Sequence, residues 1–181
     1  IILIIVVLLI LFIISVYNSL VTLRQRVKNA FGQMDVQLQR RFDLIPNLVE
    51  TVKGYMTHES DTLAKVTELR TAWAGAKTVD EKAKLDNELS NTLKTIMAVA
   101  EAYPDLKANQ NFESLQNELT ETEDKISYSR QFYNDTVTRY NTKLELFPSN
   151  IIAGMFHFTA ESLFEVDSAE ARKNVKVDFN K

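Results

Sequence analysis

The chain has 181 residues, of which 45% are hydrophobic and 25% are charged, a composition typical of a globular domain. Its net charge of −3 argues against the basic surface that a nucleic-acid partner requires. The absence of cysteine excludes disulfides and thiolate metal sites. Because only four glycines and three prolines interrupt the chain, we expect long helices and few hairpins.

Residues 1–23 predict a transmembrane anchor. The first fourteen side chains are all apolar, and the first charge is Arg24. A helix of this stretch is roughly 34 Å long at about 1.5 Å per residue, enough for a bilayer core of about 30 Å. No small-x-small site follows, so we expect an anchor rather than a cleaved signal peptide, the alternative being a buried soluble helix. The anchor residues include Ile1, Ile5, Leu9, Phe12 and, at the interface, Tyr17.

The side of the membrane on which the remaining chain lies stays open. Arg24, Arg26 and Lys28 follow the anchor and favour a cytoplasmic domain by the positive-inside rule. A basic segment before Ile1 would reverse that preference. We therefore expect a single-pass protein of the cell membrane without assigning its orientation.

Breaks at proline and glycine divide residues 24–147 into four expected helices. Proline removes a backbone donor and disfavours helix in the residue before it, so we expect turns at Pro46 and Pro104 and an end at Pro148. Thr78 and Glu81 form a T-x-x-E capping box. The expected helices are the anchor continued to residue 44, then residues 46–74, 78–103 and 111–147.

Apolar spacing supports these helices and their packing. The last helix carries a seven-residue repeat at Phe112, Leu119, Ile126, Tyr133, Tyr140 and Phe147. The other three each carry one apolar stripe. The pattern predicts an all-α fold in which the transmembrane helix continues into an up-and-down four-helix bundle, followed by a short extended C-terminal tail.

Residues 148–181 predict an apolar segment and a tail. The first helix rises roughly 45 Å from the Pro46 turn to the membrane, and the last helix rises beside it. The segment that follows is then expected near the bilayer surface, the alternative being a cap on the bundle core. Further along, Ser168 and Glu170 suggest a short capped helix, and Val175, Val177 and Phe179 an extended clasp. The residues of the interfacial segment are Ile151, Ile152, Met155, Phe156 and Phe158.

Several stretches resemble the LemA family of bacterial membrane proteins. They are YNSLV at 17–21, DVQLQRRFDLIPNLVE at 35–50, VKGY at 52–55, HE at 58–59, FPSNIIAG at 147–154 and VDF at 177–179. The resemblance covers nearly the whole chain. It implies one N-terminal membrane helix carrying a soluble four-helix bundle, and it carries over no catalytic residue or cofactor.

No sequence pattern predicts an enzyme, a cofactor or a metal site. A di-iron bundle needs Glu-x-x-His pairs, but the residues three before His58 and His157 are Tyr55 and Gly154. Phosphate-loop and nucleophile-elbow motifs are also missing.

Two groups of polar residues are candidates for a special role. The first group lies on the apolar stripes of the expected helices and consists of Glu59, Glu123 and Arg130. If these residues are buried, they form a polar layer that fixes the register of the helices or binds an ion. If the helices are rotated, the same residues are exposed. The second group, around the expected Pro46 turn, is either a contact patch or a set of local helix-end interactions. It consists of Asp35, Arg40, Arg41 and Asp43.

Three functions compete on this basis. The first is a non-enzymatic membrane scaffold that self-associates, with the lipid bilayer and further copies of the chain as partners. The second is an adaptor or sensor that binds another protein, such as a membrane protein, through the Arg40–Pro46 end. The third is a cryptic enzyme or metal- or ion-binding bundle using Glu59, Glu123 and His58.

Overall fold

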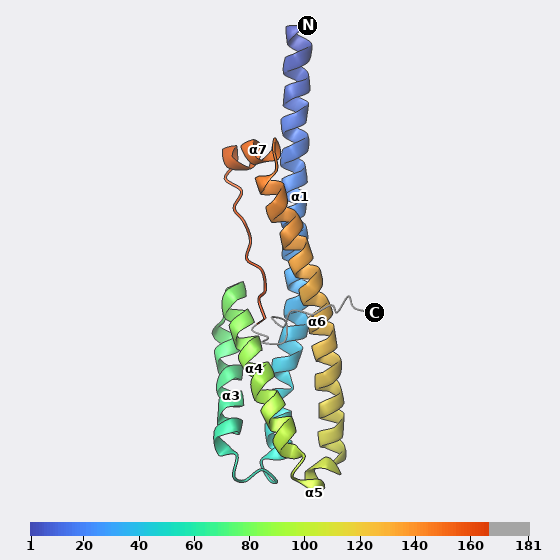
Figure 1. Ribbon diagram of the computed structural model, residues 1–181, viewed down its shortest axis with the longest axis vertical. Helices are drawn as coiled ribbons and strands as arrows, with labels where there is room; N and C mark the ends of the chain where they lie inside the picture. Colours follow the sequence, from blue (N-terminus) through green and yellow to red (C-terminus); the bar gives the residue numbers. More distant parts are fainter. Residues whose placement is uncertain (167–181) are drawn as a thin grey trace, which may run out of the picture.

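The computed structural model describes residues 1–166, which form an elongated, all-helical molecule built along one long helix (Figure 1). The predicted all-α class and the long apolar N-terminal helix are thereby confirmed. The short helix expected at Ser168 and the clasp expected at Val175, Val177 and Phe179 lie outside the described residues. The helices are α1 (Ile2–Asp43), α2 (Ile45–Val52), α3 (Ser60–Gly75), α4 (Val79–Ala100), α5 (Pro104–Lys107), α6 (Gln110–Glu145) and α7 (Ser149–Met155).

Helix α1 passes through two different environments. Its first residues stand clear of the rest of the molecule, and the apolar side chains of residues 1–12 are exposed, from 96% at Ile1 to 40% at Phe12. Further along, Val27, Ala30 and Met34 are buried at the three- and four-residue spacing of a helix face. The apolar part of α1 is long enough to cross a membrane.

The prediction that the chain turns at Pro46 is wrong. Leu44 keeps a helical conformation (φ −76°, ψ −18°), and the Leu48 amide donates to the Leu44 carbonyl at 3.0 Å. Pro46 lies in the first turn of α2, where its missing N–H is not needed and its fixed φ suits the helix. Helix α1 therefore continues into α2, and the chain reverses at residues 53–59, so the helix expected over 46–74 is in fact two.

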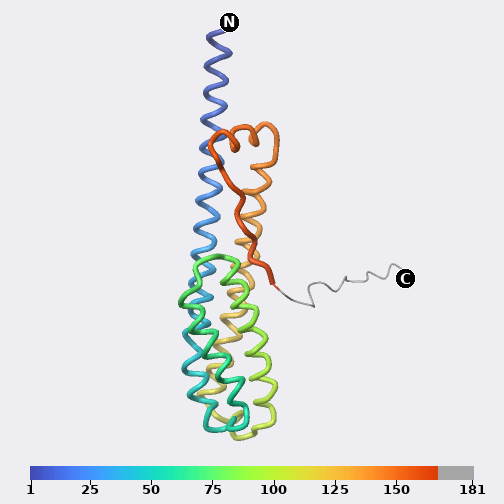
Figure 2. Tube along the Cα trace, turned by 90° about the vertical axis from the view of Figure 1, so that its left-hand side faces the viewer, coloured from blue at the N-terminus to red at the C-terminus, as the bar shows by residue number. Residues whose placement is uncertain are grey.

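The lower part of the molecule is one helical body. Helices α1, α3, α4 and α6 lie side by side there, with α6 antiparallel to α1 (Figures 1 and 2). The rings of Phe42 and Trp73 stack with centroids 4.3 Å apart, and the Trp73 indole donates to Gln39 Oε1 at 2.9 Å. The shared core draws on every one of these helices and includes Met34, Leu38, Leu48, Val66, Leu69, Leu89, Ile96, Leu119 and Ile126.

The helix ends follow local capping rules. The capping box at Thr78 is present: Thr78 Oγ1 accepts from the Glu81 amide at 3.1 Å, and Glu81 Oε2 accepts from the Thr78 amide at 3.0 Å. Asn109 caps α6 by accepting from two amides of its first turn. Because α6 ends at Glu145, Phe147 leaves the apolar repeat and is 79% exposed.

Candidate functional site

Helix α7 crosses α1 near the end of the exposed apolar stretch (Figure 1). Its Ile152 and Ala153 are buried against Val16 and Leu20 of α1. The segment thus has two faces, one packed on α1 and one turned outward. We call its exposed apolar side chains, together with those that flank it on either side, the apolar collar. The apolar collar consists of Leu146, Phe147, Ile151, Met155 and Phe156.

An aromatic cluster joins the apolar collar to α1. The Tyr17 ring lies 4.8 Å from that of Phe156 and 5.7 Å from that of Phe158, measured between centroids. The Arg24 guanidinium lies 4.9 Å from the Phe158 ring centroid, within cation–π distance. Of the predicted interfacial residues, Phe156 and Phe158 lie beside Tyr17, Ile152 is buried against α1, and Ile151 and Met155 are exposed.

Both ends of α7 are held by hydrogen bonds. The Ser149 hydroxyl lies 2.7 and 2.8 Å from the carbonyl oxygens of Lys143 and Leu146, at the C-terminal end of α6. At the other end, the Phe158 amide donates to Ala153 and the His157 amide to Gly154, the pattern of a Schellman motif. His157 takes the left-handed position of that motif, with φ 54°, where glycine is usual.

After α7 the chain returns along α6 as an extended strap, residues 158–166. Asn134 and Asn141 each form hydrogen bonds with both the backbone N–H and the backbone C=O of one strap residue. The Asn134 amide donates to the Phe164 carbonyl at 3.1 Å, and its oxygen accepts from the Phe164 amide at 2.8 Å. Asn141 does the same with Glu161, at 2.9 and 3.0 Å.

The tyrosine before each of these asparagines also binds the strap. The Tyr133 hydroxyl donates to the Ser162 carbonyl at 2.8 Å and that of Tyr140 to the Thr159 carbonyl at 3.0 Å. The two Tyr-Asn pairs are seven residues apart on α6, and the strap residues that they bind are three residues apart. Seven residues of helix and three residues of extended chain both advance by about 10 Å, so the spacing of the pairs matches the spacing along the strap. Burial raises the pKa of Tyr133 to about 12 and also raises the pKa of Tyr140.

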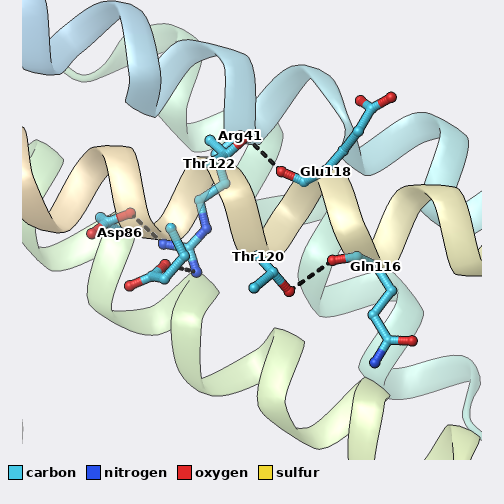
Figure 3. Close-up of polar contacts among 7 residues, drawn as sticks. Arg41, Asp86, Gln116, Glu118, Thr120 and Thr122 are labelled. Carbon is cyan, nitrogen blue, oxygen red and sulfur yellow. Dashed lines mark hydrogen bonds and ion pairs between the residues drawn. The ribbon is translucent and has the colours of Figure 1, made fainter.

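An ion triad of Arg41, Asp86 and Glu123 lies in the helical body, with Arg41 and Asp86 buried and the Glu123 side chain 43% exposed (Figure 3). Arg41 Nη1 of α1 lies 2.8 Å from Asp86 Oδ1 of α4, and Nη2 lies 2.9 Å from Glu123 Oε2 of α6. Only 5% of the Arg41 side chain and 2% of the Asp86 side chain are exposed. Burial raises the pKa of the Asp86 carboxyl, and the neighbouring Arg41 charge opposes that rise. The triad joins three helices at one level.

The structure brings together only part of the predicted polar layer. Glu123 pairs with Arg41 at the edge of the helical body, and Arg130 lines the same groove between α4 and α6 as these two residues, a groove of about 850 Å³. Glu59 lies elsewhere: its carboxylate accepts from the Tyr103 hydroxyl at 3.1 Å, beyond the end of α4. Because Asp86 lies about 20 Å from that end, Glu59 is not part of this layer. No cluster able to hold a metal occurs within residues 1–166.

The predicted contact patch is also corrected. Arg41 is buried in the triad, so it cannot contribute to a surface patch. Asp35 pairs with Lys82 of α4, and Asp43 accepts from Gln39 at 2.8 Å. Arg40 stays exposed, but on the side of the rod rather than at its far end, since the chain continues to residue 52.

Asp86 is the one triad member that the sequence analysis missed. It occupies a position in the buried stripe of α4, three residues from both Ala83 and Leu89. A charge on an apolar stripe is the same signal that pointed to Glu123 on α6. Applying that criterion to every helix would have found it.

The chain is similar in sequence to several known proteins. The chain is 24% identical over 155 residues to Protein LemA of Metamycoplasma hominis, covering 84% of this chain and 70% of that protein. It is 25% identical over 175 residues to Magnetosome protein MamQ 2 of Paramagnetospirillum magneticum and 22% identical over 174 residues to Magnetosome protein MamQ of Magnetospirillum gryphiswaldense. Both matches cover 82% of this chain and 64% of the relative, so the chain spans less than two thirds of the MamQ proteins. The model of the LemA family matches residues 30–179, and the chain therefore belongs to the LemA family.

Proposed function

We propose that the protein is a non-enzymatic, membrane-anchored scaffold that self-associates at the cell membrane. The observation that carries the proposal is the division of α1 into an exposed apolar part and a part buried in the helical body. Exposed apolar surface of this extent is unusual for a soluble monomer and is satisfied in lipid. Because α1 is one helix, the body is held rigidly to the anchor.

The relatives support this general class of protein. Membership of the LemA family and the likeness to magnetosome proteins MamQ favour a membrane-associated helical protein. The Glu123 carboxylate is paired with Arg41 and that of Glu59 accepts from the Tyr103 hydroxyl, which favours a scaffold over the ion-binding alternative.

Membrane anchoring is tested by placing charges in the exposed part of α1. The double variant Leu9→Arg/Phe12→Arg adds two buried charges, each costing about 3 kcal/mol at a bilayer centre. We expect the wild type to resist alkaline carbonate extraction from membranes and the variant to be released. Tyr128→Arg, which adds a charge to an exposed position of α6, is the control and should remain bound. Extraction of the wild type itself would contradict the proposal.

Self-association is proposed to use an exposed aromatic pair on α6. Tyr128 and Phe132 are 76% and 51% exposed and, four residues apart, lie on one helix face. We expect chemical crosslinking in native membranes to yield oligomers of the wild type and mainly monomers of Tyr128→Glu/Phe132→Glu. Gln131→Glu is the control, since it adds a charge at a neighbouring exposed position. A monomeric wild type in the membrane would exclude self-association.

The adaptor role remains a second candidate because of one exposed apolar residue. Val36 is 65% exposed on α1 and, with Asp35, Arg40 and Asp43, lines a shallow surface groove. A partner protein with an apolar side chain and complementary charges fits this surface. The same crosslinking experiment distinguishes the roles, because a foreign protein captured by wild type and lost in Val36→Asp supports the adaptor.

A further inference from the structure

We propose that the apolar collar is seated in the interfacial layer of the bilayer that α1 crosses, so that the protein meets lipid at two separate elements. This inference rests on the proposed anchoring by α1. It adds a second lipid-binding surface, formed by the outward face of α7 and the residues that flank it.

The height of α7 along α1 favours this placement. Helix α7 packs against Val16 and Leu20, which precede the first charged residue, Arg24, by eight and four positions. At about 1.5 Å per residue these positions lie roughly 6–12 Å from Arg24, toward the lipid. Interfacial helices bury their apolar faces by about 5–10 Å, so α7 is at the depth such a helix occupies.

The direction and composition of α7 suit a membrane surface. Helix α7 runs across α1 rather than along it, which places it parallel to the bilayer plane when α1 spans the bilayer (Figure 1). Ile152 and Ala153 pin its inner face, so Ile151 and Met155 remain outside, 52% and 60% exposed. The helix contains no charged side chain. Lipid contact would therefore desolvate no ion.

The residues that follow α7 mark the change from lipid to water. Phe158 packs under the Arg24 guanidinium, and Arg24 is followed by further basic residues of α1 suited to lipid phosphates. Below this level the strap is held by polar bonds to α6, from Thr159 onward. The apolar collar thus lies on the lipid side of Arg24 and the strap on the water side.

The natural absence of cysteine allows a direct test by site-directed spin labelling of the full chain. Single cysteines are placed at Met155 in the apolar collar, at Phe12 in the anchor and at Asn117, an exposed position of α6. The labelled proteins are reconstituted in vesicles of phosphatidylcholine and phosphatidylglycerol. Collision rates of each label with oxygen and with a water-soluble nickel chelate report its depth. We expect oxygen to dominate at Phe12 and Met155, less strongly at Met155, and the chelate to dominate at Asn117.

The result at each site has a definite meaning. A water-exposed label at Met155 with a lipid-exposed label at Phe12 would overturn the seating of the apolar collar and leave anchoring intact. A water-exposed label at Phe12 would overturn the anchor as well. Because a label can disturb α7 locally, Ile151→Cys on the same outward face gives a second measurement. The proposal requires lipid exposure at both collar positions.

Discussion

At the residue scale, Arg41 shows how a buried charge ties helices together. Its guanidinium is shared between Asp86 and Glu123, so removing one carboxylate leaves a buried cation partly unpaired. Burial raises the pKa of Asp86, so desolvation of its carboxylate offsets part of the attraction to Arg41. Removing one partner is therefore expected to cost more than removing the buried pair.

We expect Asp86→Ala to lower the free energy of unfolding by about 3 kcal/mol, because the Arg41 charge stays buried with one partner fewer. The double variant Arg41→Met/Asp86→Leu should recover most of that loss, since it removes both ions. Urea denaturation followed by circular dichroism measures both. Asp124→Ala, at an exposed site of α6, is the control. A single variant within 0.5 kcal/mol of wild type, roughly the effect of a surface substitution, would contradict a buried pair of Arg41 and Asp86.

A second residue-scale prediction concerns His157. The left-handed φ of 54° strains any side chain other than glycine, so His157→Gly should stabilise the protein by about 1 kcal/mol. His157→Ala keeps the Cβ and should leave stability close to that of wild type. Thermal unfolding of the three proteins in one detergent checks the order. Equal stability of the glycine and alanine variants would refute the strain.

At the element scale, the strap depends on four residues of α6. Asn134→Ala/Asn141→Ala removes four hydrogen bonds to the strap backbone, each worth about 1 kcal/mol. We expect the amides of Glu161 and Phe164 to exchange hydrogen much faster in this variant. Thr138→Ala, also on α6 but bonded only to its own helix, should leave both amides protected. Protection unchanged in the double variant would show that burial of Phe164 alone holds the strap.

The strap also predicts a pH dependence. Because the folded pKa of Tyr133 is about 12, above its ordinary value of 10.0, the contribution of this phenol to stability is complete below pH 10. It is lost as the pH rises from 10 toward 12, where ionisation removes the bond to Ser162. We expect denaturation midpoints to fall over this interval in wild type. Tyr133→Phe should show a smaller fall, and equal falls would count against the role of Tyr133.

Periodicity and capping residues account for what could be predicted of these elements. The heptad repeat of α6 and the capping box of α4 follow from local rules, and both are present. The strap could not be predicted, because Tyr133 and Tyr140 satisfy the apolar repeat equally well whether or not their hydroxyls bind another segment. The prediction of a turn at Pro46 failed for a related reason. Proline breaks the interior of a helix but fits its first turn, and only tertiary packing decides which of these two positions it occupies.

At the scale of the whole molecule, the continuity of α1 links the apolar segment to the helical body. We expect Gln25→Pro, at an exposed position between the two, to cost about 3 kcal/mol of local helix stability and to introduce a kink. Distances between spin labels at Phe12 and Val36 should then become broad instead of narrow. Gln25→Ala should keep the narrow distribution. A narrow distribution in the proline variant would mean that neighbouring helices hold the rod straight.

The candidate site was predictable at this scale only in outline. Composition and length predicted the anchor segment, and the height comparison brought residues 151–158 beside it, although the assumed turn at Pro46 was wrong. That comparison survives because α6 has 36 residues, as many as the helical path from residue 17 to residue 52, so α6 rises to about the level of residue 17. The outward face of α7 was not predictable, since it depends on which side Ile152 packs against α1.

Because α1 continues into α2 without a hinge, a tilt of its membrane-spanning part also moves the far end of the molecule. From residue 23 to residue 52 the helical path measures about 44 Å. Transmembrane helices commonly lean by about 20° from the bilayer normal to match its thickness, and such a lean would swing the far tip sideways by about 15 Å. Small differences in bilayer thickness would then be magnified into the spacing between the tips of neighbouring copies.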